Sequence, residues 1–233
     1  MKNGILVFFL VFTIGCGHVS KKTDSYSGIG VESVKPEVLK KYVPPPLSEE
    51  TLKTVKKMLD IQNPSLGRLH PDGKRMFFNW SVSGQNHVWK INGPLSFPVQ
   101  LTGGKDATYL SAMIPDGKWL VISRDEDGQE NPGIFLQSPE GGDLIPIFKK
   151  EKVRAQLNLI TDDSKWIYFS ANDKKPESYT IYAYDIEKKQ TIMILDLPGT
   201  WHAVDQKGNG QKLLLVKLTG WRWREYYEWD SRI

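Results

Sequence analysis

Residues 114–123 read Ile-Pro-Asp-Gly-Lys-Trp-Leu-Val-Ile-Ser, a tight-turn sequence followed at once by an apolar run. The Asp-Gly pair favours a chain reversal, and the run of branched and aromatic residues favours a buried strand. The same order recurs as HPDGKRMFFNW at 70–80, DDSKWIYFS at 162–170 and GNGQKLLLVK at 208–217. The lysines of these four copies lie 44, 47 and 47 residues apart. Near-constant spacing of this kind predicts a repeat architecture.

Further strands are predicted around each turn. A short strand enters the turn, and another strand follows the apolar run at 87–91, 134–137, 181–185 and 226–230. In the first three copies a last strand follows at 98–101, 144–148 and 191–195. Four strands in about 45 residues are typical of a propeller blade. The predicted fold is therefore all-β: a partial β-propeller of about four blades, each a four-stranded antiparallel sheet, with the last blade incomplete.

Composition agrees with a globular all-β chain. The 233 residues include 20 Gly, 14 Pro, 8 Trp, 9 Tyr and 9 Phe, and 25% of them are charged. These values argue against a chain that is disordered throughout and against a polytopic membrane protein. The net charge of +4 is too small to demand a nucleic-acid partner, and a single cysteine allows no disulfide framework.

The first 16 residues have the features of an export signal. Lys2 precedes an apolar stretch at 4–14, which is too short to span a bilayer but fits a signal-peptide core. Thr13-Ile14-Gly15-Cys16 resembles the cleavage site of bacterial lipoproteins, which implies that Cys16 becomes the acylated N-terminus. An ordinary secretory signal with an incidental cysteine is the alternative. We expect a protein exported to the bacterial cell envelope and attached to membrane lipid through Cys16, at the outer membrane or the periplasmic face.

A tether and a helix are predicted between the signal and the repeats. Residues 17–47 contain Ser, Lys, Gly and the run Pro44-Pro45-Pro46, which favours an extended, flexible tether. Ser48 is a suitable N-cap for one short amphipathic helix at about 49–60. The predicted organisation is thus a signal peptide at 1–16, a tether at 17–47, and the helix with the partial propeller at 48–233.

The repeat resembles those of a known group of propellers. Pro-Asp-Gly-Lys, an apolar strand and a second strand with a Gly-containing turn are similar to the TolB-type, WD-like repeat. Residues 124–136 and 221–230 also resemble blades in the N-terminal propeller of prolyl oligopeptidase-family serine peptidases, such as acylaminoacyl- and dipeptidyl-peptidases. The resemblance covers about 60–233. In that family the propeller accompanies an α/β-hydrolase domain with a Ser, Asp and His triad.

The catalytic half of such a peptidase is not expected in this chain. The sequence contains no Gly-x-Ser-x-Gly nucleophile motif, and only 21 residues follow Lys212. The four histidines, His18, His70, His87 and His202, lie in the tether or beside predicted strands. We therefore predict no catalytic residues and no enzyme activity for the chain by itself.

Three other patterns have residue types that occur in binding sites. The acidic segment 125–130 offers oxygen ligands for Ca²⁺, but it lacks the full calcium-loop pattern, and a solvated hairpin turn explains it more simply. The aromatic and basic segment 221–229 suits stacking on bases or sugars, but alternation places Trp221, Trp223, Tyr227 and Trp229 on one face, as inter-blade packing requires. The histidines lack metal-ligand spacing. The prediction is no metal, no cofactor and no nucleic-acid partner.

The expected function is a non-catalytic, membrane-anchored propeller that gates substrate or binds a peptide or protein, as a truncated or split form of such a peptidase. One alternative is a TolB-like lipoprotein that binds envelope proteins. Another is one half of a two-chain peptidase. Because a partial propeller leaves open sheet edges, self-association through those edges is also expected.

Overall fold

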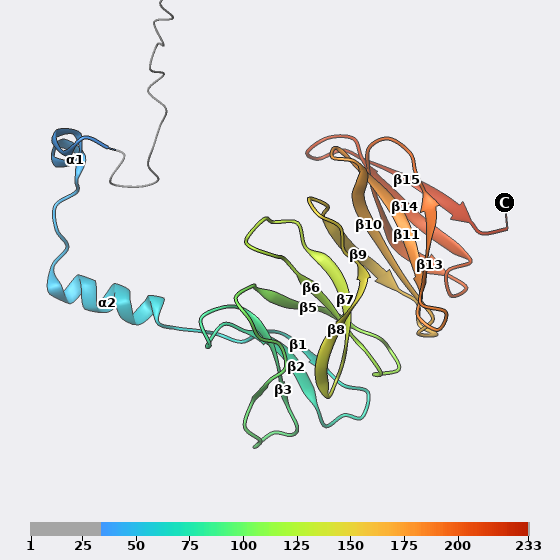
Figure 1. Ribbon diagram of the computed structural model, residues 1–233, viewed down its shortest axis with the longest axis horizontal. Coiled ribbons are helices and arrows are strands. Elements are labelled where there is room, and N and C mark those ends of the chain that lie inside the picture. The colour runs from blue at the N-terminus through green and yellow to red at the C-terminus, as the bar shows by residue number, and fades with distance from the viewer. Residues whose placement is uncertain (1–33, 233) are drawn as a thin grey trace, which may run out of the picture. The chain divides into compact units, whose positions relative to one another are not determined.

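The computed structural model describes residues 34–232, and the chain divides into two compact units, one ending at Lys56 and the other beginning at Lys57 (Figure 1). Two helices precede the strands, α1 (Pro36–Tyr42) and α2 (Glu49–Leu59), where one was expected. Helix α1 lies within the predicted tether, with Pro36 in its first turn. Helix α2 begins as predicted, because the Ser48 hydroxyl accepts a hydrogen bond of 3.1 Å from the backbone N–H of Thr51.

The second unit is built from fifteen strands, which fall into four successive groups that we call blades 1 to 4 (Figure 1). Blade 1 contains β1 (Ser65–Leu69), β2 (Met76–Trp80), β3 (His87–Ile91) and β4 (Val99–Gln100). Blade 2 contains β5 (Thr108–Met113), β6 (Leu120–Arg124), β7 (Gly133–Ser138) and β8 (Gly141–Phe148). Blade 3 contains β9 (Ala155–Ile160), β10 (Trp166–Lys175), β11 (Ser178–Asp185) and β12 (Gln190–Leu195). Blade 4 contains β13 (Thr200–Lys207), β14 (Lys212–Leu218) and β15 (Arg224–Asp230).

The strand order confirms a partial propeller. Within each blade the strands pair antiparallel in chain order, and blade 4 has three strands among the described residues. A single parallel bridge between Tyr179 and Thr200 joins β11 to β13, so that blades 3 and 4 form one seven-stranded sheet. The strand predicted at 87–91 is found with the same bounds, and the others agree to within a few residues.

In blade 4 the strand pairing aligns the repeat one residue earlier than the lysine spacing predicts. Across the four turns, the paired residues that lie seven positions apart are Leu69 with Met76, Met113 with Leu120, Ile160 with Ile167, and Gln206 with Leu213. Lys74, Lys118 and Lys165 precede these pairs by two residues, and in blade 4 that position is held by Gln211. The prediction that Lys212 is the fourth copy of this lysine is therefore wrong. Lys212 instead corresponds to Arg75, Trp119 and Trp166.

The same irregularity interrupts the first strand of every blade. The register shifts between Ser65 and Arg68, between Leu110 and Ala112, next to Leu157, and between Ala203 and Asp205. A β-bulge at a fixed place re-aims the extra residue out of the ladder. In blade 3 this residue is Asn158, whose side-chain oxygen accepts a 3.1 Å hydrogen bond from the backbone N–H of Ala203 in blade 4.

The hydrophobic core lies between successive blades. Phe77 of blade 1 packs with Leu120 and Ile122 of blade 2. Val121 of blade 2 packs with Ile167 and Phe169 of blade 3, and Tyr168 of blade 3 packs with Leu213 and Leu215 of blade 4, and all nine of these side chains are buried. Each blade therefore has a forward face, which contacts the following blade, and a rear face, which contacts the preceding one.

Candidate functional site

The forward face of blade 4 and the rear face of blade 1 have no covering blade among the described residues. Strand pairing assigns Leu214, Val216 and Glu228 to the forward face of blade 4, at the positions of Phe77, Asn79 and Lys90 in blade 1. Leu214 is 40% exposed, whereas Phe77, its counterpart at the junction of blades 1 and 2, is completely buried. These two faces are the principal candidate interaction surfaces.

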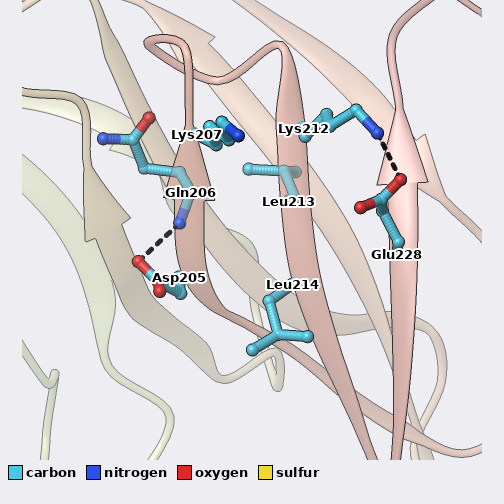
Figure 2. A pocket seen from close by; sticks show the side chains of 7 residues that line it. All are labelled: Asp205, Gln206, Lys207, Lys212, Leu213, Leu214 and Glu228. Atoms are coloured by element: carbon cyan, nitrogen blue, oxygen red, sulfur yellow. Dashed lines mark hydrogen bonds and ion pairs between the residues drawn. The ribbon is translucent and has the colours of Figure 1, made fainter.

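The forward face of blade 4 carries a small pocket of about 130 Å³ (Figure 2). Its lining combines two leucines with charged and polar side chains and consists of Asp205, Gln206, Lys207, Lys212, Leu213, Leu214 and Glu228. The Lys212 ammonium donates to the Glu228 carboxylate across the mouth of the pocket and lies 3.5 Å from Asp230. The hydrogen bond to Glu228 raises the pKa of Lys212. Lys212 and Glu228 are therefore paired with each other, and the Asp205 carboxylate accepts the backbone N–H of Gln206 at 2.8 Å.

The rear face of blade 1 is more apolar and more deeply hollowed. Two adjacent hollows of about 360 and 410 Å³ share Met76 and Ile91 in their linings. The connection from β3 to β4 borders the second hollow through Asn92, Gly93 and Pro94. The same connection carries Leu95 and Phe97, which are 100% and 91% exposed. Exposed apolar surface concentrated in this way marks an interaction site.

We call the connection between the third and fourth strands of a blade its outer connection. The outer connection of blade 2 is part of a charged cluster at the junction of blades 1 and 2. Glu140, in the turn between β7 and β8, accepts hydrogen bonds from Arg75 and, at 2.9 Å, from Lys90. The Lys90 ammonium also donates to the carbonyl of Pro139 at 3.2 Å, and its side chain is nearly buried. The Lys90 ammonium, reinforced by Arg75, lowers the pKa of Glu140 below its usual value. The forward face of one blade thus holds the outer connection of the next.

A buried polar cluster lies nearer the inner strands of blades 3 and 4. The Ser170 hydroxyl lies 3.1 Å from Nδ1 of His202 and accepts a hydrogen bond of 3.2 Å from Asn158. Burial lowers the pKa of His202, whose ring also lies 6.0 Å from that of Tyr179. Although a serine and a histidine meet here, Ser170 has no exposed surface, so its hydroxyl is not accessible to a substrate.

The acidic segment 125–130 forms a turn that Asp125 closes and that neighbouring lysines contact. Both carboxylate oxygens of Asp125 accept backbone N–H groups, from Glu130 at 2.8 Å and Asn131 at 3.0 Å. Asp127 pairs with Lys105, and Glu126 lies 3.5 Å from Lys149. Residues 34–232 contain no group of three or more His, Cys, Asp or Glu side chains arranged to hold a metal ion. The geometry matches the solvated hairpin turn.

The aromatic and basic segment 221–229 divides into two parts. Trp229 packs against the apolar cluster shared by blades 3 and 4, and the Tyr227 ring lies 5.1 Å from that of Trp201 within blade 4. Trp221 and Trp223 precede β15 and are 96% and 76% exposed, so the prediction that all four pack together on one face is wrong. The strand begins only at Arg224, because the N–H of Thr219 bonds to the carbonyl of Trp223 and closes a turn.

The remaining predicted residues have separate places. Nε2 of His70 lies 3.1 Å from the carbonyl oxygen of Gly117 in the next blade. His87 is buried, its Nδ1 lies 3.4 Å from the Thr102 hydroxyl, and burial lowers its pKa. Cys16, the predicted lipid attachment site, and His18 lie outside the described residues. Within 34–232 no helix has the length and apolar character that crossing a bilayer requires.

Sequence reasoning missed the hollows on blade 1 and the exposed loop at 92–98. Leu95 and Phe97 stand between Pro94 and Pro98 in a segment with no strand periodicity. The length of the connection between the third and fourth strands could have indicated this loop. It has seven residues between β3 and β4, where the equivalent connection between β7 and β8 has two.

Comparison with solved structures places the fold among known propellers. A prolyl endopeptidase matches 84% of this chain with a TM-score of 0.62 and 16% sequence identity. TolB of Agrobacterium tumefaciens matches 72% of the chain with a TM-score of 0.53 and 16% identity, and a puromycin hydrolase matches 73% with a TM-score of 0.53 and 14% identity. No protein-family model and no curated protein sequence matches the chain.

These matches confirm the resemblance at the level of the fold, a TolB-like propeller of the kind found in prolyl oligopeptidase-type enzymes. The chain spans about a third of the prolyl endopeptidase chain, 31%, and covers 63% of TolB and 27% of the puromycin hydrolase. The similarity to the two peptidases is thus limited to one part of each, and the residues described here form propeller blades.

Proposed function

We propose that this chain is a non-catalytic propeller module of the bacterial cell envelope, anchored to lipid through Cys16, that binds a peptide or protein. The observation that carries the non-catalytic assignment is the burial of Ser170. Among residues 34–232, Ser170 and His202 form the one serine–histidine hydrogen bond, and a nucleophilic serine must be reachable by its substrate. Support for binding comes from the apolar hollows on blade 1.

A peptidase assay tests the non-catalytic assignment. The purified full-length chain is incubated with aminoacyl-nitroanilides and with a fluorophosphonate probe, beside the Ser170→Ala variant. We expect no turnover and no labelling of either protein above the rate without protein. Turnover by the wild-type chain that Ser170→Ala abolishes would overturn the assignment and identify the buried pair as a nucleophile and its base.

Metabolic labelling tests the anchor. Cells that express the chain are grown with an alkyne-bearing fatty acid, and the protein is recovered and coupled to a fluorophore. We expect labelling of the wild-type chain and none of Cys16→Ser. Equal labelling of both would place the lipid elsewhere, and labelling of neither, with a mature protein released in soluble form, would favour the ordinary secretory signal.

A two-chain peptidase is the second candidate, and the coverage of 31% of a prolyl endopeptidase favours it. If it is correct, a neighbouring reading frame encodes a hydrolase domain with a Gly-x-Ser-x-Gly motif. Co-expression of the two chains would then yield peptidase activity that neither has alone. A TolB-like protein-binding role predicts no such frame and the recovery of an envelope protein after cross-linking.

A further inference from the structure

The three junctions inside this chain follow one rule. At each, forward-face side chains share an ion-pair cluster, an apolar cluster or a pocket lining with the outer connection of the following blade. Arg75 and Lys90 of blade 1 hold Glu140 in the turn between β7 and β8. Trp119 of blade 2 belongs to the same apolar cluster as Ile186, which directly follows β11. Trp166 and Ala183 of blade 3 line a pocket together with Ser231, which directly follows β15.

The forward face of blade 4 and the rear face of blade 1 have the parts that the two sides of such a junction contain. In blade 4 the positions of Arg75 and Lys90 are held by Lys212 and Glu228, which border the pocket of Figure 2. In blade 1 the outer connection is residues 92–98, which project Leu95 and Phe97 into solvent. Met76 and Phe78 of blade 1, at the rear-face positions of Leu120 and Ile122, line the empty hollow of about 360 Å³.

The charges of the two halves agree with each other. At the junction of blades 1 and 2, two cations on the forward face require the anion Glu140 on the opposing turn. On blade 4 the cation and the anion are paired within the face itself, through Lys212 and Glu228. Asp205 and Lys207, the other charged residues of the pocket lining, are also of opposite sign, so the lining has no net charge. The opposing connection then needs no charge, and residues 92–98, Asn-Gly-Pro-Leu-Ser-Phe-Pro, carry none. A connection with a Glu or Lys at its tip would leave that charge without a partner.

We propose that the forward face of blade 4 binds the rear face of blade 1 of a second copy of this chain. Leu95 and Phe97 of one copy lie over the pocket lined by Lys212, Leu214 and Glu228 of the other. Leu214 of the second copy packs on Met76 and Ile91 of the first, as Phe77 packs on Leu120 within the chain. Two copies joined head to tail in both directions form a two-fold symmetric ring of eight blades, the upper end of the usual propeller range.

This inference rests on the binding role in the proposed function and deepens it, because it names a second copy of this chain as the protein that the blade 1 hollows bind. It also accounts for the two nearly fully exposed apolar side chains at 95 and 97 and for the unfilled hollows together. A ring closed in this way leaves neither the rear face of blade 1 nor the forward face of blade 4 open to aggregation. The open-ended alternative, a chain of copies that never closes, has the same contacts but no limiting mass.

The experiment measures the mass of the full-length chain by sedimentation equilibrium in a density-matched non-ionic detergent, over a wide range of protein concentration. We expect a dimer that dissociates on dilution. The variants Leu95→Asp/Phe97→Asp and Leu214→Asp should each raise the dissociation constant by roughly 10- to 100-fold. Met193→Asp, at an exposed apolar position on the outer strand β12, is the matched control and should leave the dimer intact.

Mixing the two dissociated variants tests the head-to-tail arrangement. A copy altered at 95 and 97 keeps an intact blade 4 face, and a copy altered at 214 keeps an intact blade 1 face. Their equimolar mixture should therefore form a one-to-one complex with a single junction, which neither variant forms alone. This recovery also shows that both variants are folded.

Three outcomes would overturn the inference: a monomer at every concentration, a dimer that survives both sets of substitutions, or variants that stay monomeric on mixing. A mass that rises without limit would contradict the closed ring. None of these results bears on peptidase activity or on the acylation of Cys16, so the non-catalytic assignment and the lipid anchor of the proposed function are tested separately.

Discussion

The imidazole Nε2 of His70 lies 3.1 Å from the carbonyl oxygen of Gly117, a residue 47 positions further along the chain and in the next blade. Both belong to the repeated turn, and the contact recurs in altered form at the other junctions. The hydroxyl of Ser164 accepts the N–H of Asp116 at 3.0 Å, and the hydroxyl of Tyr168 donates to the carbonyl of Gly210 at 3.4 Å. The turns that mark the repeat in sequence are therefore also the points where neighbouring blades are joined.

Gly117 is expected to be much less tolerant of alanine than Gly73, its counterpart in blade 1. Both have positive φ, +75° and +69°, which costs alanine about 1–2 kcal/mol. A Cβ at Gly117 would also lie 2.6 Å from Nε2 of His70, whereas nothing lies within 4 Å of a Cβ at Gly73. Gly117→Ala should therefore lower the free energy of unfolding by about 1–3 kcal/mol more than Gly73→Ala does, as measured in urea. Equal losses would show that the His70 contact is not formed.

Gly210 and Tyr168 are expected to be energetically coupled. A Cβ at Gly210 would collide with the Tyr168 hydroxyl oxygen. Gly210→Ala should destabilise the wild-type chain more than it destabilises Tyr168→Phe, because phenylalanine removes the colliding atom. A double-mutant cycle measured by urea unfolding should give a coupling of about 0.5–2 kcal/mol. Tyr182→Phe, at a buried tyrosine that contacts blade 2, is the control and should show additivity with Gly210→Ala.

Glu140→Gln is expected to weaken the junction of blades 1 and 2. The glutamine amide has one acceptor oxygen for the two cations, Lys90 and Arg75, and no negative charge, so the nearly buried Lys90 ammonium loses its counter-ion. The free energy of unfolding at pH 7 should fall by about 1–3 kcal/mol. Glu151→Gln removes an exposed ion pair with Lys152 and should change stability by less than about 0.5 kcal/mol.

The contribution of Glu140 should also depend on pH. Because its pKa is lowered in the folded state, the unfolded chain binds the proton more readily. The stabilisation is therefore present above the unfolded pKa, about 4.3, and is lost as pH falls through the lower folded pKa. Urea titrations between pH 7 and pH 3 should show a smaller acid-dependent loss in Glu140→Gln. Parallel curves for the variant and the wild type would contradict this expectation.

His202 is expected to make the fold sensitive to mild acid. Burial lowers its pKa below the usual value of 6.5, so the unfolded chain takes up a proton before the folded chain does. Stability is therefore highest above about pH 6.5 and falls as pH decreases toward the folded pKa. His202→Gln should reduce this slope between pH 7.5 and pH 5.5. His87→Gln should reduce it as well, because the pKa of His87 is shifted in the same direction. An unchanged slope in both variants would show that these rings titrate normally.

Much of the fold could be predicted because turn and strand signals coincide in each repeat. Asp-Gly reverses the chain, and the following residues alternate between two buried faces, as Phe77, Val121 and Tyr168 do on the forward faces. The register of blade 4 could not be predicted, because Lys212 has the same chemistry as the lysines that precede it in the repeat. Only the pairing of Gln206 with Leu213 identifies Gln211 as the equivalent position. Helix α1 was missed because its seven residues are too few for a periodic pattern.

The candidate site was less predictable than the fold. Which face of a blade stays uncovered depends on contacts between residues some 45 positions apart, which no local pattern encodes. The strand predicted at 226–230 begins at Arg224, and the turn closed by Thr219 and Trp223 leaves Trp221 exposed instead of packed. The burial of Ser170 likewise follows from β13 lying against blade 3, with Asn158 bonded to Ala203. These relationships are tertiary contacts, which local strand propensity does not predict.

The bulge that interrupts the first strand of every blade has a consequence for how the fold opens. Through Asn158 it ties the inner edge of blade 3 to the backbone of blade 4, so separating these blades requires breaking the hydrogen bond from Ala203 to Asn158 as well as the apolar contact. Within residues 34–232 of a single copy, blades 2 and 3 each contact two neighbouring blades, whereas blades 1 and 4 each contact one. Local opening of a linear array begins at its ends. Backbone amides of β6 and β10 should therefore exchange with deuterated solvent last, and those of β1 and β15 first.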